Sequence, residues 1–477
     1  MRAATAGLAL AAGGAAYALA RRHDANRRAA EAEADAGRPV RCRVVVAGAG
    51  FGGLEAAKVL AGRPGVELTV IDRHNHHLFQ PLLYQVATAA LAPTDIAAPV
   101  RDILPVSRRV RVVMDTVTGV DVPGQRVLCG DQSYPYDELI LATGSQPSYF
   151  GHGEWAKAAT GLKTLEDAAS LREQIISAFE LAVKAASPAE RDPLLTFAMI
   201  GGGPNGVEMA GSVAELAEEM LRADFAMPGA RARVVVIEAG PRLLAEYADT
   251  LSDYAKRRLE ALGVEVWTGQ AVSAIEGGVV RTKQRTLDVG VVVWTAGTEA
   301  TPVASWLGVE PGKGGLVPVD ADLRVAGRGP VSVVGDAALV DGKRLPGLAP
   351  VAKQQGRYAG RAVLARMHAR PGRRPFRYLD YGVMTAIARN EAVADLHGVR
   401  LKGFPAWCLW AVAHVFFLIG FRNRVLVSTQ WLFAYVLRQR SGRLITGPAV
   451  TNPGQPPVAK PGYNVIPPST NNVAPVT

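Results

Sequence analysis

The amino-acid sequence predicts an α/β protein with two Rossmann-like dinucleotide-binding domains, the second inserted into the first, followed by a C-terminal helical membrane-attachment region. Three observations carry this prediction. A glycine-rich motif behind a β-branched run occurs twice, an acid ends the next apolar run in each unit, and an acid–apolar–glycine segment also occurs twice. With 477 residues, 49% of them hydrophobic, the chain is long enough for two or three domains with their own cores.

Two glycine-rich turns are the strongest of these signals. The first, Gly48-Ala49-Gly50-Phe51-Gly52-Gly53, follows Arg43-Val44-Val45-Val46, and the second, Gly201-Gly202-Gly203-Pro204-Asn205-Gly206, follows Phe197-Ala198-Met199-Ile200. The first glycine permits a tight turn from strand to helix, the second lets the backbone approach a pyrophosphate, and the third lets the helix pack closely on the strand. A single motif of this kind is often an ordinary glycine turn, whereas two in succession indicate a protein that holds two dinucleotides.

An acid ends the strand that follows each glycine motif. Asp72 lies 24 residues after Gly48, and Glu238 lies 37 residues after Gly201. We attribute the longer second interval to an extended helix over residues 207–221 and a loop around residues 227–229. A carboxylate here accepts hydrogen bonds from ribose hydroxyl groups and repels a 2′-phosphate, which favours NAD over NADP.

A second repeat supports the first. Residues 137–144 and 288–297 each consist of an acid, an apolar run and a turn of small residues. Each is expected to form a buried strand that closes its unit and brings backbone against the bound dinucleotide, at Gly144 in one copy and Gly297 in the other.

Charge and cysteine content limit the function classes. The formal charge is +10, which nucleic acid or an anionic membrane surface could explain. Because the sequence has neither an RNA-binding signature nor a basic helix-turn-helix, we exclude nucleic acid and prefer the membrane. Cys42, Cys129 and Cys408 form no C-x-x-C motif, so the sequence indicates neither a redox disulfide nor a zinc site and fits a reducing compartment.

The two ends of the chain differ in composition from the rest. Residues 3–20 are apolar and precede four arginines, a pattern open to three interpretations: a weak membrane anchor, a leader, or a remnant of an over-long start. Positive charge after this segment would keep the remainder in the cytoplasm. Residues 31–39 are interpreted as a linker. From Gly447 onward, frequent proline and asparagine predict a disordered tail.

Near the C-terminus, two apolar stretches are rich in aromatic residues. Residues 404–421 include His414 as the one strongly polar side chain, and residues 431–437 follow after Arg422-Asn423-Arg424. Tryptophan and tyrosine favour headgroup depth, and the arginines at the edges favour anionic lipid, so we expect a monotopic attachment. The alternative is a buried helical pair or the interface of a homodimer.

Several further segments resemble one family in order and spacing. Residues 75–88 (Asn-His-His-Leu-Phe-Gln-Pro-Leu-Leu-Tyr-Gln-Val-Ala-Thr) strongly resemble the corresponding segment of type II NADH dehydrogenases, which are single-subunit, non-pumping NADH:quinone oxidoreductases of the two-dinucleotide-binding flavoprotein superfamily. The other matching segments are residues 141–145, 293–297, 334–337, 347–356 and 420–424. The resemblance covers roughly residues 40–440.

This resemblance implies FAD in the first unit and NADH in the second. The implied FAD contacts are Gly48, Gly50, Phe51, Gly52, Gly53, Leu54, Asp72, His76, Val117, Thr143, Gly144 and Asp336, the last on the ribityl chain. The implied NADH contacts are Gly201, Gly203, Pro204, Asn205, Gly206, Glu238 and Gly297. The expected domains are an N-terminal segment and linker (1–39), a first FAD-binding part (40–155), an NADH-binding domain (156–297), a second FAD-binding part (298–385), a membrane-attachment region (386–445) and a tail (446–477).

The resemblance also suggests residues for catalysis. Glu208, expected in the first turn of a helix, would lie beside the flavin, although capping of the helix dipole is the alternative. Gln354 and Gln355 would hydrogen-bond quinone carbonyl groups. Lys353 could reach solvent or pair with an acid such as Glu208, and His76, His77 and His414 are more simply packed or interfacial residues than proton donors.

The expected activity is oxidation of NADH with two-electron reduction of a membrane quinone, without ion pumping, at the cytoplasmic face of the inner (plasma) membrane. A disulfide reductase is rejected because residues 80–88 occupy the region of its redox cysteines, and a sulfide-oxidising quinone reductase is disfavoured for the same lack of cysteines. The alternative from another class is a flavoprotein binding module or redox sensor that signals the NADH state without rapid turnover.

Overall fold

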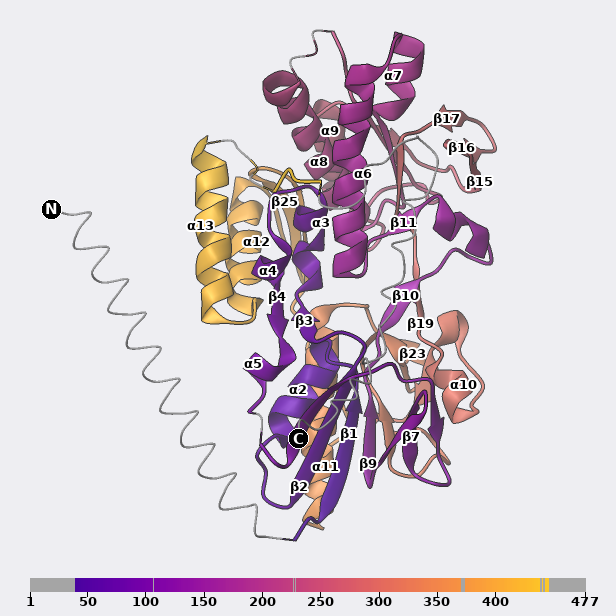
Figure 1. Ribbon diagram of the computed structural model, residues 1–477, viewed down its shortest axis with the longest axis vertical. Helices are drawn as coiled ribbons and strands as arrows, with labels where there is room; N and C mark the ends of the chain where they lie inside the picture. The colour runs from indigo at the N-terminus through magenta and orange to yellow at the C-terminus, as the bar shows by residue number, and fades with distance from the viewer. Residues whose placement is uncertain are drawn as a thin grey trace, which may run out of the picture.

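The computed structural model describes residues 39–105, 107–225, 227, 229–369, 374–437, 440 and 442–445. The expected N-terminal apolar segment, all of the linker except its last residue, and the tail lie outside these residues. In the described part, two five-stranded sheets form the centres of two units that are stacked along the long axis of the molecule (Figure 1).

The sheet of the first unit is entirely parallel and ends with a strand from far along the chain. Its order is β21 (Val331–Val333), β9 (Glu138–Leu141), β1 (Cys42–Ala47), β2 (Val66–Asp72) and β5 (Val110–Met114). Because β21 comes after the whole second unit, the second unit is inserted into the first, as predicted.

The second unit repeats this plan with another parallel sheet. Its order is β11 (Thr160–Gly161), β18 (Val291–Trp294), β12 (Thr196–Ile200), β13 (Arg233–Ile237) and β14 (Val264–Trp267). Two connecting strands, β10 (Ser145–Pro147) and β19 (Thr298–Ala300), run antiparallel between the units. Both lie directly beyond the predicted closing segments, so the repeat and the α/β fold class are confirmed.

Helices cover both sheets. In the first unit α2 (Phe51–Leu60) and α11 (Ala349–Met367) lie side by side, and they can approach because a Cβ on Gly356 would overlap the Gly52 carbonyl oxygen (Figure 1). The second unit is covered by α6 (Leu165–Lys184), α7 (Pro188–Leu194), α8 (Pro204–Glu219) and α9 (Asp249–Ala261). After α8 the chain forms one π-helical stretch, Met220–Asp224, before the predicted loop.

Short elements make up the connections. They are β3 (His76–Leu78), α3 (Leu83–Ala87), α4 (Pro93–Ile96), β4 (Ala97–Pro99), α5 (Val100–Ile103), β6 (Gly119–Asp121), β7 (Arg126–Cys129), β8 (Gln132–Pro135), β15 (Val272–Glu276), β16 (Val279–Thr282), β17 (Thr286–Asp288), α10 (Val303–Leu307), β20 (Val317–Val319), β22 (Ala338–Val340) and β23 (Lys343–Arg344). Five single turns of helix complete this set: Gln80–Leu82, Gly153–Lys157, Met220–Asp224, Lys313–Gly315 and Gly335–Ala337.

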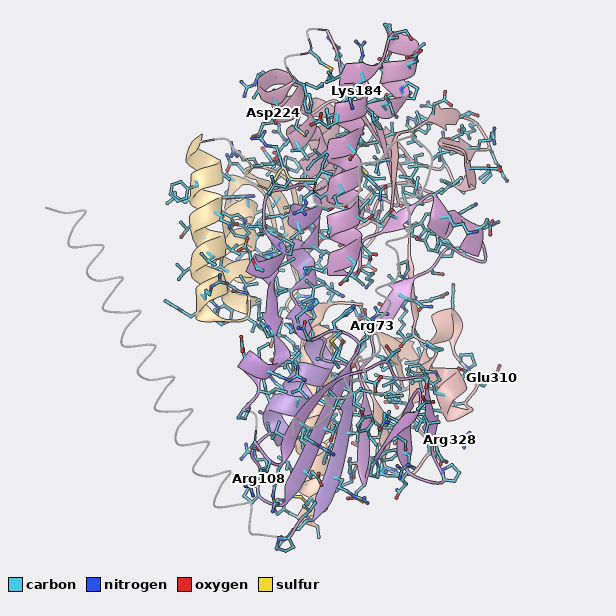
Figure 2. All side chains as sticks on the ribbon, viewed as in Figure 1. Arg73, Arg108, Lys184, Asp224, Glu310 and Arg328 are labelled. Carbon is cyan, nitrogen blue, oxygen red and sulfur yellow. The ribbon has the colours of Figure 1, made fainter. Side chains whose placement is uncertain are left out.

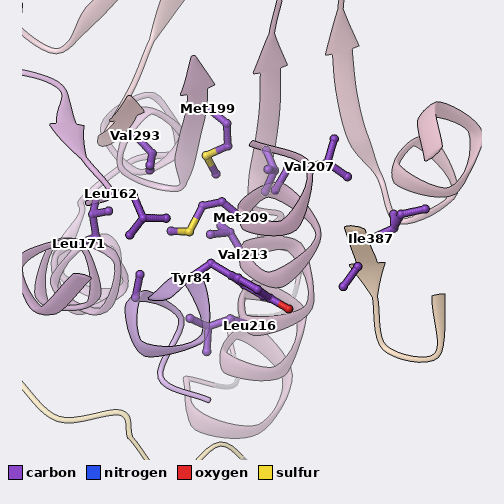
Figure 3. Close-up of a cluster of buried hydrophobic side chains, with 14 of the residues drawn as sticks. Tyr84, Leu162, Leu171, Met199, Val207, Met209, Val213, Leu216, Val293 and Ile387 are labelled. Carbon is purple, nitrogen blue, oxygen red and sulfur yellow. The ribbon is translucent and has the colours of Figure 1, made fainter. Parts of the chain in front are cut away.

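The largest buried cluster joins α8 to elements from both ends of the chain. Figure 3 shows Tyr84 of α3 among Met209, Val213 and Leu216 of α8, with Ile387 of a C-terminal strand on the far side of the helix. The labelled charged side chains of Lys184 and Asp224 lie outside this core, at the top of Figure 2. Helix α8 is therefore held from several directions at once.

The C-terminal region differs from the prediction in its first part. Residues 386–403 are not helical, because β24 (Val383–Ala388), β25 (Glu391–Leu396) and β26 (Val399–Gly403) form an antiparallel sheet that packs against α8. Two helices follow, α12 (Phe404–Phe417) and α13 (Phe421–Leu437), side by side on one flank (Figure 1). The break lies at Gly420, which has φ +86°, so the arginines 422 and 424 open α13 instead of separating two segments.

None of the described helices is long and apolar enough to cross a bilayer.

A buried arginine ties the end of the chain to α8. Arg440 Nη2 lies 3.0 Å from Glu215 Oε2, and its Nη1 donates to the carbonyl groups of Thr88 and Ser212 at 3.0 and 3.1 Å. The Arg440 backbone N–H also donates to Glu219. Since Ser212, Glu215 and Glu219 all belong to α8, this group holds the segment after α13 against the helix.

We expect Arg440→Met to lower the free energy of unfolding by about 2 kcal/mol, because it leaves the part-buried Glu215 carboxylate without its cation and two backbone carbonyl groups without their donor. Arg443→Met is the matched control, since Arg443 also contacts Glu219 but has a more exposed side chain (22% against 12%). Arg443→Met should lower the free energy of unfolding by less than about 1 kcal/mol. Denaturant unfolding of both proteins measures the difference, and equal losses would contradict a clamp centred on Arg440.

Candidate active site

The first glycine motif has the geometry of a dinucleotide cradle. Gly48 has φ +103°, and a Cβ there would overlap the Ala142 carbonyl oxygen, while a Cβ on Gly53 would overlap the carbonyl oxygen of Gly48. Gly50 is different, because a Cβ on it would meet no described protein atom within 4 Å. The outer two glycines are therefore required by packing, whereas the middle one borders open space at the N-terminus of α2.

The second motif repeats these three roles. Gly201 has φ +111°, and a Cβ there would overlap backbone of Thr295 and Ala296. A Cβ on Gly206 would overlap the Gly201 carbonyl oxygen, and one on Gly203 would again meet no described protein atom within 4 Å. Two equivalent cradles thus lie at the carboxyl ends of β1 and β12, where open α/β sheets bind ligands.

The predicted acids lie beside these cradles and brace them. Asp72 Oδ2 accepts from Ala49 N at 2.6 Å, and Glu238 Oε2 accepts from Gly202 N at 2.6 Å. Glu238 Oε1 also accepts from Gly240 N at 2.6 Å. Each carboxylate therefore fixes the second residue of its glycine motif and keeps lone pairs for a ribose.

Residues from three parts of the chain meet around Asp336. Its Oδ2 accepts from the Ser145 hydroxyl at 2.8 Å, which in turn accepts from Lys163 Nζ at 3.0 Å. Sequence reasoning missed Lys163 and Ser145, although Ser145 directly follows the predicted Gly144. Gln355 accepts from Gly335 N at 2.6 Å through Oε1, while its buried Nε2 has no partner among the described residues. A buried donor without a partner beside this group fits a ligand with acceptor atoms.

The remaining predicted contacts lie around the same edges. Val117 follows β5, whose neighbour Asp115 donates its N–H to the Asp72 carbonyl group at 2.9 Å. The Thr143 and Thr301 hydroxyl groups are 2.6 Å apart beside Gly144, which has φ +72°. A Cβ on Gly297 would lie 2.7 Å from the Phe150 ring.

Glu208 is buried and lies in the second turn of α8, not in the first turn as predicted, because α8 begins at Pro204. Helix capping therefore does not explain it. Burial raises the pKa of its carboxyl group to about 8, and the Ala386 N–H at 3.4 Å opposes the shift, as does the nearby Trp410 indole, whose N–H falls short of hydrogen-bond geometry. At neutral pH Glu208 is a protonated acid that can donate a proton.

Two buried tyrosines that sequence reasoning did not assign to the site, Tyr84 and Tyr247, lie close enough to Glu208 for its charge to raise their pKa values. Gln85 Nε2 donates to the Tyr84 hydroxyl at 3.1 Å, and Trp431 of α13 donates to Gln85 Oε1 at 2.8 Å. On another side the Tyr247 and Thr385 hydroxyl groups are 2.5 Å apart. Burial raises the pKa of Tyr84 well above its usual value, and negative charge on Glu208 raises it further, which indicates that these groups share one environment.

A row of aromatic rings connects the first glycine motif to the C-terminal helices. The Phe51 and Phe79 ring centroids are 5.9 Å apart, Phe79 and His414 are 6.1 Å apart, and His414 stacks on Trp410 at 4.3 Å. Trp410 stacks in turn on Trp431 at 5.3 Å. The site around Glu208 is thus walled by apolar surface that continues to α12 and α13.

The predicted histidines are buried or half-buried, and the Gln354 amide is hydrogen-bonded to the backbone. Burial lowers the pKa of His77 and of His414 to about 4, so both are neutral near pH 7 and are the packed residues that the sequence suggested. His76 is half-buried and stacks on His74. Both ends of the Gln354 amide are taken by backbone, since Nε2 donates to Leu379 O at 2.8 Å and Oε1 accepts from Leu379 N at 2.9 Å.

Lys353 is half-buried and has no ion-pair partner in the described part of the chain. It does not pair with Glu208, and its Nζ lies over the rings of Phe51 and Phe417, at 5.6 and 5.0 Å from their centroids.

Comparison with known proteins agrees with this geometry. The pyridine nucleotide-disulphide oxidoreductase family matches residues 42–356. The type II NADH:quinone oxidoreductases Ndh and NdhA of Mycobacterium tuberculosis are each 40% identical over 424 residues, covering 86% and 85% of this chain and 91% and 90% of theirs. The demethylphylloquinone reductase NdbB of Synechocystis sp. is 29% identical over 412 residues, which is 82% of this chain and 96% of its own.

Solved structures share the fold. NDH2 from Plasmodium falciparum in complex with NADH superposes with a TM-score of 0.77 at 18% identity, covering 85% of this chain and 99% of that one. A sulfide:quinone oxidoreductase from Aquifex aeolicus has a TM-score of 0.63 at 15% identity, covering 88% and 99%. With relatives at 40% identity over most of its length, the chain belongs to the type II NADH:quinone oxidoreductases, whose characteristic cofactor is FAD and which attach peripherally to membranes.

Proposed function

We propose that this protein uses FAD to oxidise NADH and reduce a membrane quinone by two electrons, without pumping protons. The observation that carries the proposal is the pair of equivalent cradles, each with an open middle glycine and a bracing acid. Two dinucleotides on adjoining units allow one to supply hydride and the other to relay it. The family relatives favour this turnover over the sensing role considered above.

The first cradle suits FAD. Gly48, Gly50 and Gly53 shape the turn that would receive the pyrophosphate, Asp72 lies ready for the adenosine ribose, and Asp336 for the ribityl chain. The unpartnered Gln355 Nε2 can donate to an acceptor on the ring system. When bound, FAD would supply hydride-accepting and electron-relaying chemistry, while the chain's own residues would bind, orient and shield it.

The second cradle suits NADH. Gly201, Gly203 and Gly206 play the corresponding roles, with Pro204 and Asn205 opening the helix. Glu238 would accept hydrogen bonds from the adenosine ribose and repel a 2′-phosphate.

Glu238→Gln should raise the ratio of kcat/KM for NADPH to that for NADH at least about tenfold, because it removes a charge equivalent to about 1.4 kcal/mol of discrimination. The variant should also accept more weakly from Gly202 N and Gly240 N, so that one of these N–H groups can donate to the 2′-phosphate of NADPH. Glu246→Gln, which removes an exposed carboxylate from the same loop, is the control and should leave the ratio unchanged. Steady-state kinetics with both nucleotides decides, and an unaltered ratio in Glu238→Gln would remove the assignment.

Glu208 and its surroundings are suited to bind the quinone and to give it a proton. A protonated carboxyl group in an apolar, aromatic-walled site can donate to a quinone oxygen without burying a charge. Walls of this kind would keep water away from the reacting groups and so limit competing reactions.

The exposed face of α12 and α13 suits a membrane. Its exposed apolar side chains are Phe404, Val412, Phe416, Phe417, Phe421, Val425, Leu432 and Phe433, and the exposed Lys402, Arg422 and Arg424 lie beside them. Such a face favours partial insertion into an anionic leaflet. We place it at the cytoplasmic face of the inner (plasma) membrane, in keeping with three free cysteines.

Flotation with anionic and neutral vesicles tests the attachment, and protease access in inverted membrane vesicles tests the face. If the same helices instead joined two copies of the chain, sedimentation would show a stable dimer that does not float.

The activity is tested by steady-state oxidation of NADH by purified, yellow protein with and without a soluble quinone. We expect continuous turnover that depends on quinone, and proton-tight vesicles carrying the enzyme should develop no proton gradient. A reduced complex that persists when quinone is supplied would contradict the proposal.

A further inference from the structure

Lys353 occupies a position that no structural role explains. It lies in the second turn of α11, next to Ala352, whose backbone approaches Gly52 of the first cradle. Its Nζ lies between two aromatic rings: Phe51, which opens α2 inside the glycine motif, and Phe417, which ends α12 on the exposed apolar face. The ammonium group therefore lies between the proposed FAD cradle and the proposed membrane surface.

This cation has no carboxylate of its own. Within the described ranges, Lys353 makes no hydrogen bond or ion pair. The nearby Glu55 is already taken by Lys58 at 3.2 Å and by Arg357 at 2.6 Å. Two aromatic faces compensate only part of the cost of holding an ammonium group in a half-buried place. The remaining donors of Nζ are available to an electron-rich oxygen.

We propose that Lys353 is a catalytic residue that hydrogen-bonds one carbonyl oxygen of the quinone and gives it a proton as the quinol forms. This inference rests on the proposed quinone reductase activity. An aromatic quinone ring that binds beside Phe51 and Phe417 would lie against apolar surface, with a carbonyl oxygen facing the ammonium group that the two rings hold.

The proton and electron balance is complete with the reactants of the proposed activity. Quinone gains two electrons and two protons, and NADH supplies both electrons and one proton. Glu208 gives its own proton to one quinone oxygen, and the proton from NADH restores the Glu208 carboxyl group. The second proton leaves Lys353 as one N–H bond breaks and one O–H bond forms, and water then returns a proton to the amine. The positive charge also stabilises the negative charge that develops on the oxygen.

Burial, together with the neighbouring cations, makes this amine a competent acid near neutral pH. Burial lowers the pKa of Lys353 to about 8; Glu55 opposes the shift, whereas Lys58, Arg357 and Arg424 add to it. His77, on β3, is neutral in this range. The amine is therefore charged at pH 7 and loses its proton as the pH rises through about 8.

Stopped-flow absorbance separates the two half-reactions. In Lys353→Met, reduction of the bound flavin by NADH should stay within twofold of the wild-type rate, while its reoxidation by a soluble quinone should slow on the order of 100-fold. Lys353→Arg should recover part of the loss. Lys58→Met, which removes a neighbouring cation without a place between the rings, is the control and should reoxidise at the wild-type rate.

The pH dependence provides a second readout. Because Glu208 titrates in the same range, the profile is measured in the Glu208→Gln background, where the remaining fall in reoxidation above about pH 8 belongs to Lys353. That fall should vanish when Lys353→Arg is added. Reoxidation of a folded, flavin-loaded Lys353→Met protein at the wild-type rate would overturn the inference. If wild-type flavin itself is not reoxidised by quinone, the proposed function fails instead.

Discussion

Gly50→Ala is expected to produce a folded but colourless protein. The Gly50 backbone, at φ −66° and ψ −166°, is one that alanine adopts without strain, and an added Cβ meets no described protein atom within 4 Å. The methyl group would instead occupy the space expected for the FAD pyrophosphate. We expect FAD affinity to fall at least about 100-fold, equivalent to about 2.7 kcal/mol, with little change in the stability of the apoprotein. Flavin absorbance after incubation with FAD and thermal unfolding measure the two effects.

Gly203→Ala is the matched control in the second cradle. Its backbone is nearly the same, at φ −72° and ψ −175°, and its Cβ is equally free of protein contacts. This variant should stay yellow and bind NADH weakly, so that the KM for NADH rises while flavin content does not change. If Gly203→Ala lost its colour and Gly50→Ala kept it, the assignment of FAD to the first unit and NADH to the second would be reversed.

The fold was largely predictable because its signals are local. The turns at Gly48 and Gly201 need positive φ, and Asp72 and Glu238 end strands at a spacing that the motif prescribes. The antiparallel sheet β24–β26 was missed although the sequence marks its turns, at Asn390 with φ +64° and at Gly398 with φ +99°. An apolar, alternating stretch between such turns predicts strands, and it was instead assigned to the helical region that follows.

The residues of the site could be predicted only where a single segment of the sequence determines their position. Glu208 could be singled out from its distance to the second motif, but its burial depends on Ala386 and Trp410, which lie far along the chain. Lys353 could not be placed, because its neighbours Phe51 and Phe417 come from opposite ends of the fold. In the sequence Arg440 is one of several arginines at the edge of a helix. Its mostly buried side chain and its ion pair with Glu215 become visible only in the folded structure. Contacts between distant segments leave no periodic trace in the sequence.

Glu208→Gln should slow the reoxidation of the flavin by quinone on the order of 100-fold while the rate of flavin reduction by NADH stays near the wild-type value. Glutamine keeps the size and the hydrogen bond from Ala386 N but has no proton to give. Glu218→Gln, on the exposed side of the same helix, is the control and should leave both rates unchanged. A larger effect on NADH reduction than on quinone reoxidation would assign Glu208 to nucleotide binding instead.

Glu208 should also make stability depend on pH. Burial raises the pKa of this carboxyl group from 4.5 to about 8, so between these values the native protein holds a proton that the unfolded chain has released. The free energy of unfolding should therefore fall as the pH rises through this window, by at most about 1.4 kcal/mol per pH unit. Glu208→Gln removes this contribution, so the difference in stability between variant and wild type should shift in favour of the variant as the pH rises from 5 to 8. A constant difference over that range would mean that Glu208 is already ionised in the folded protein and cannot supply the quinone with a proton.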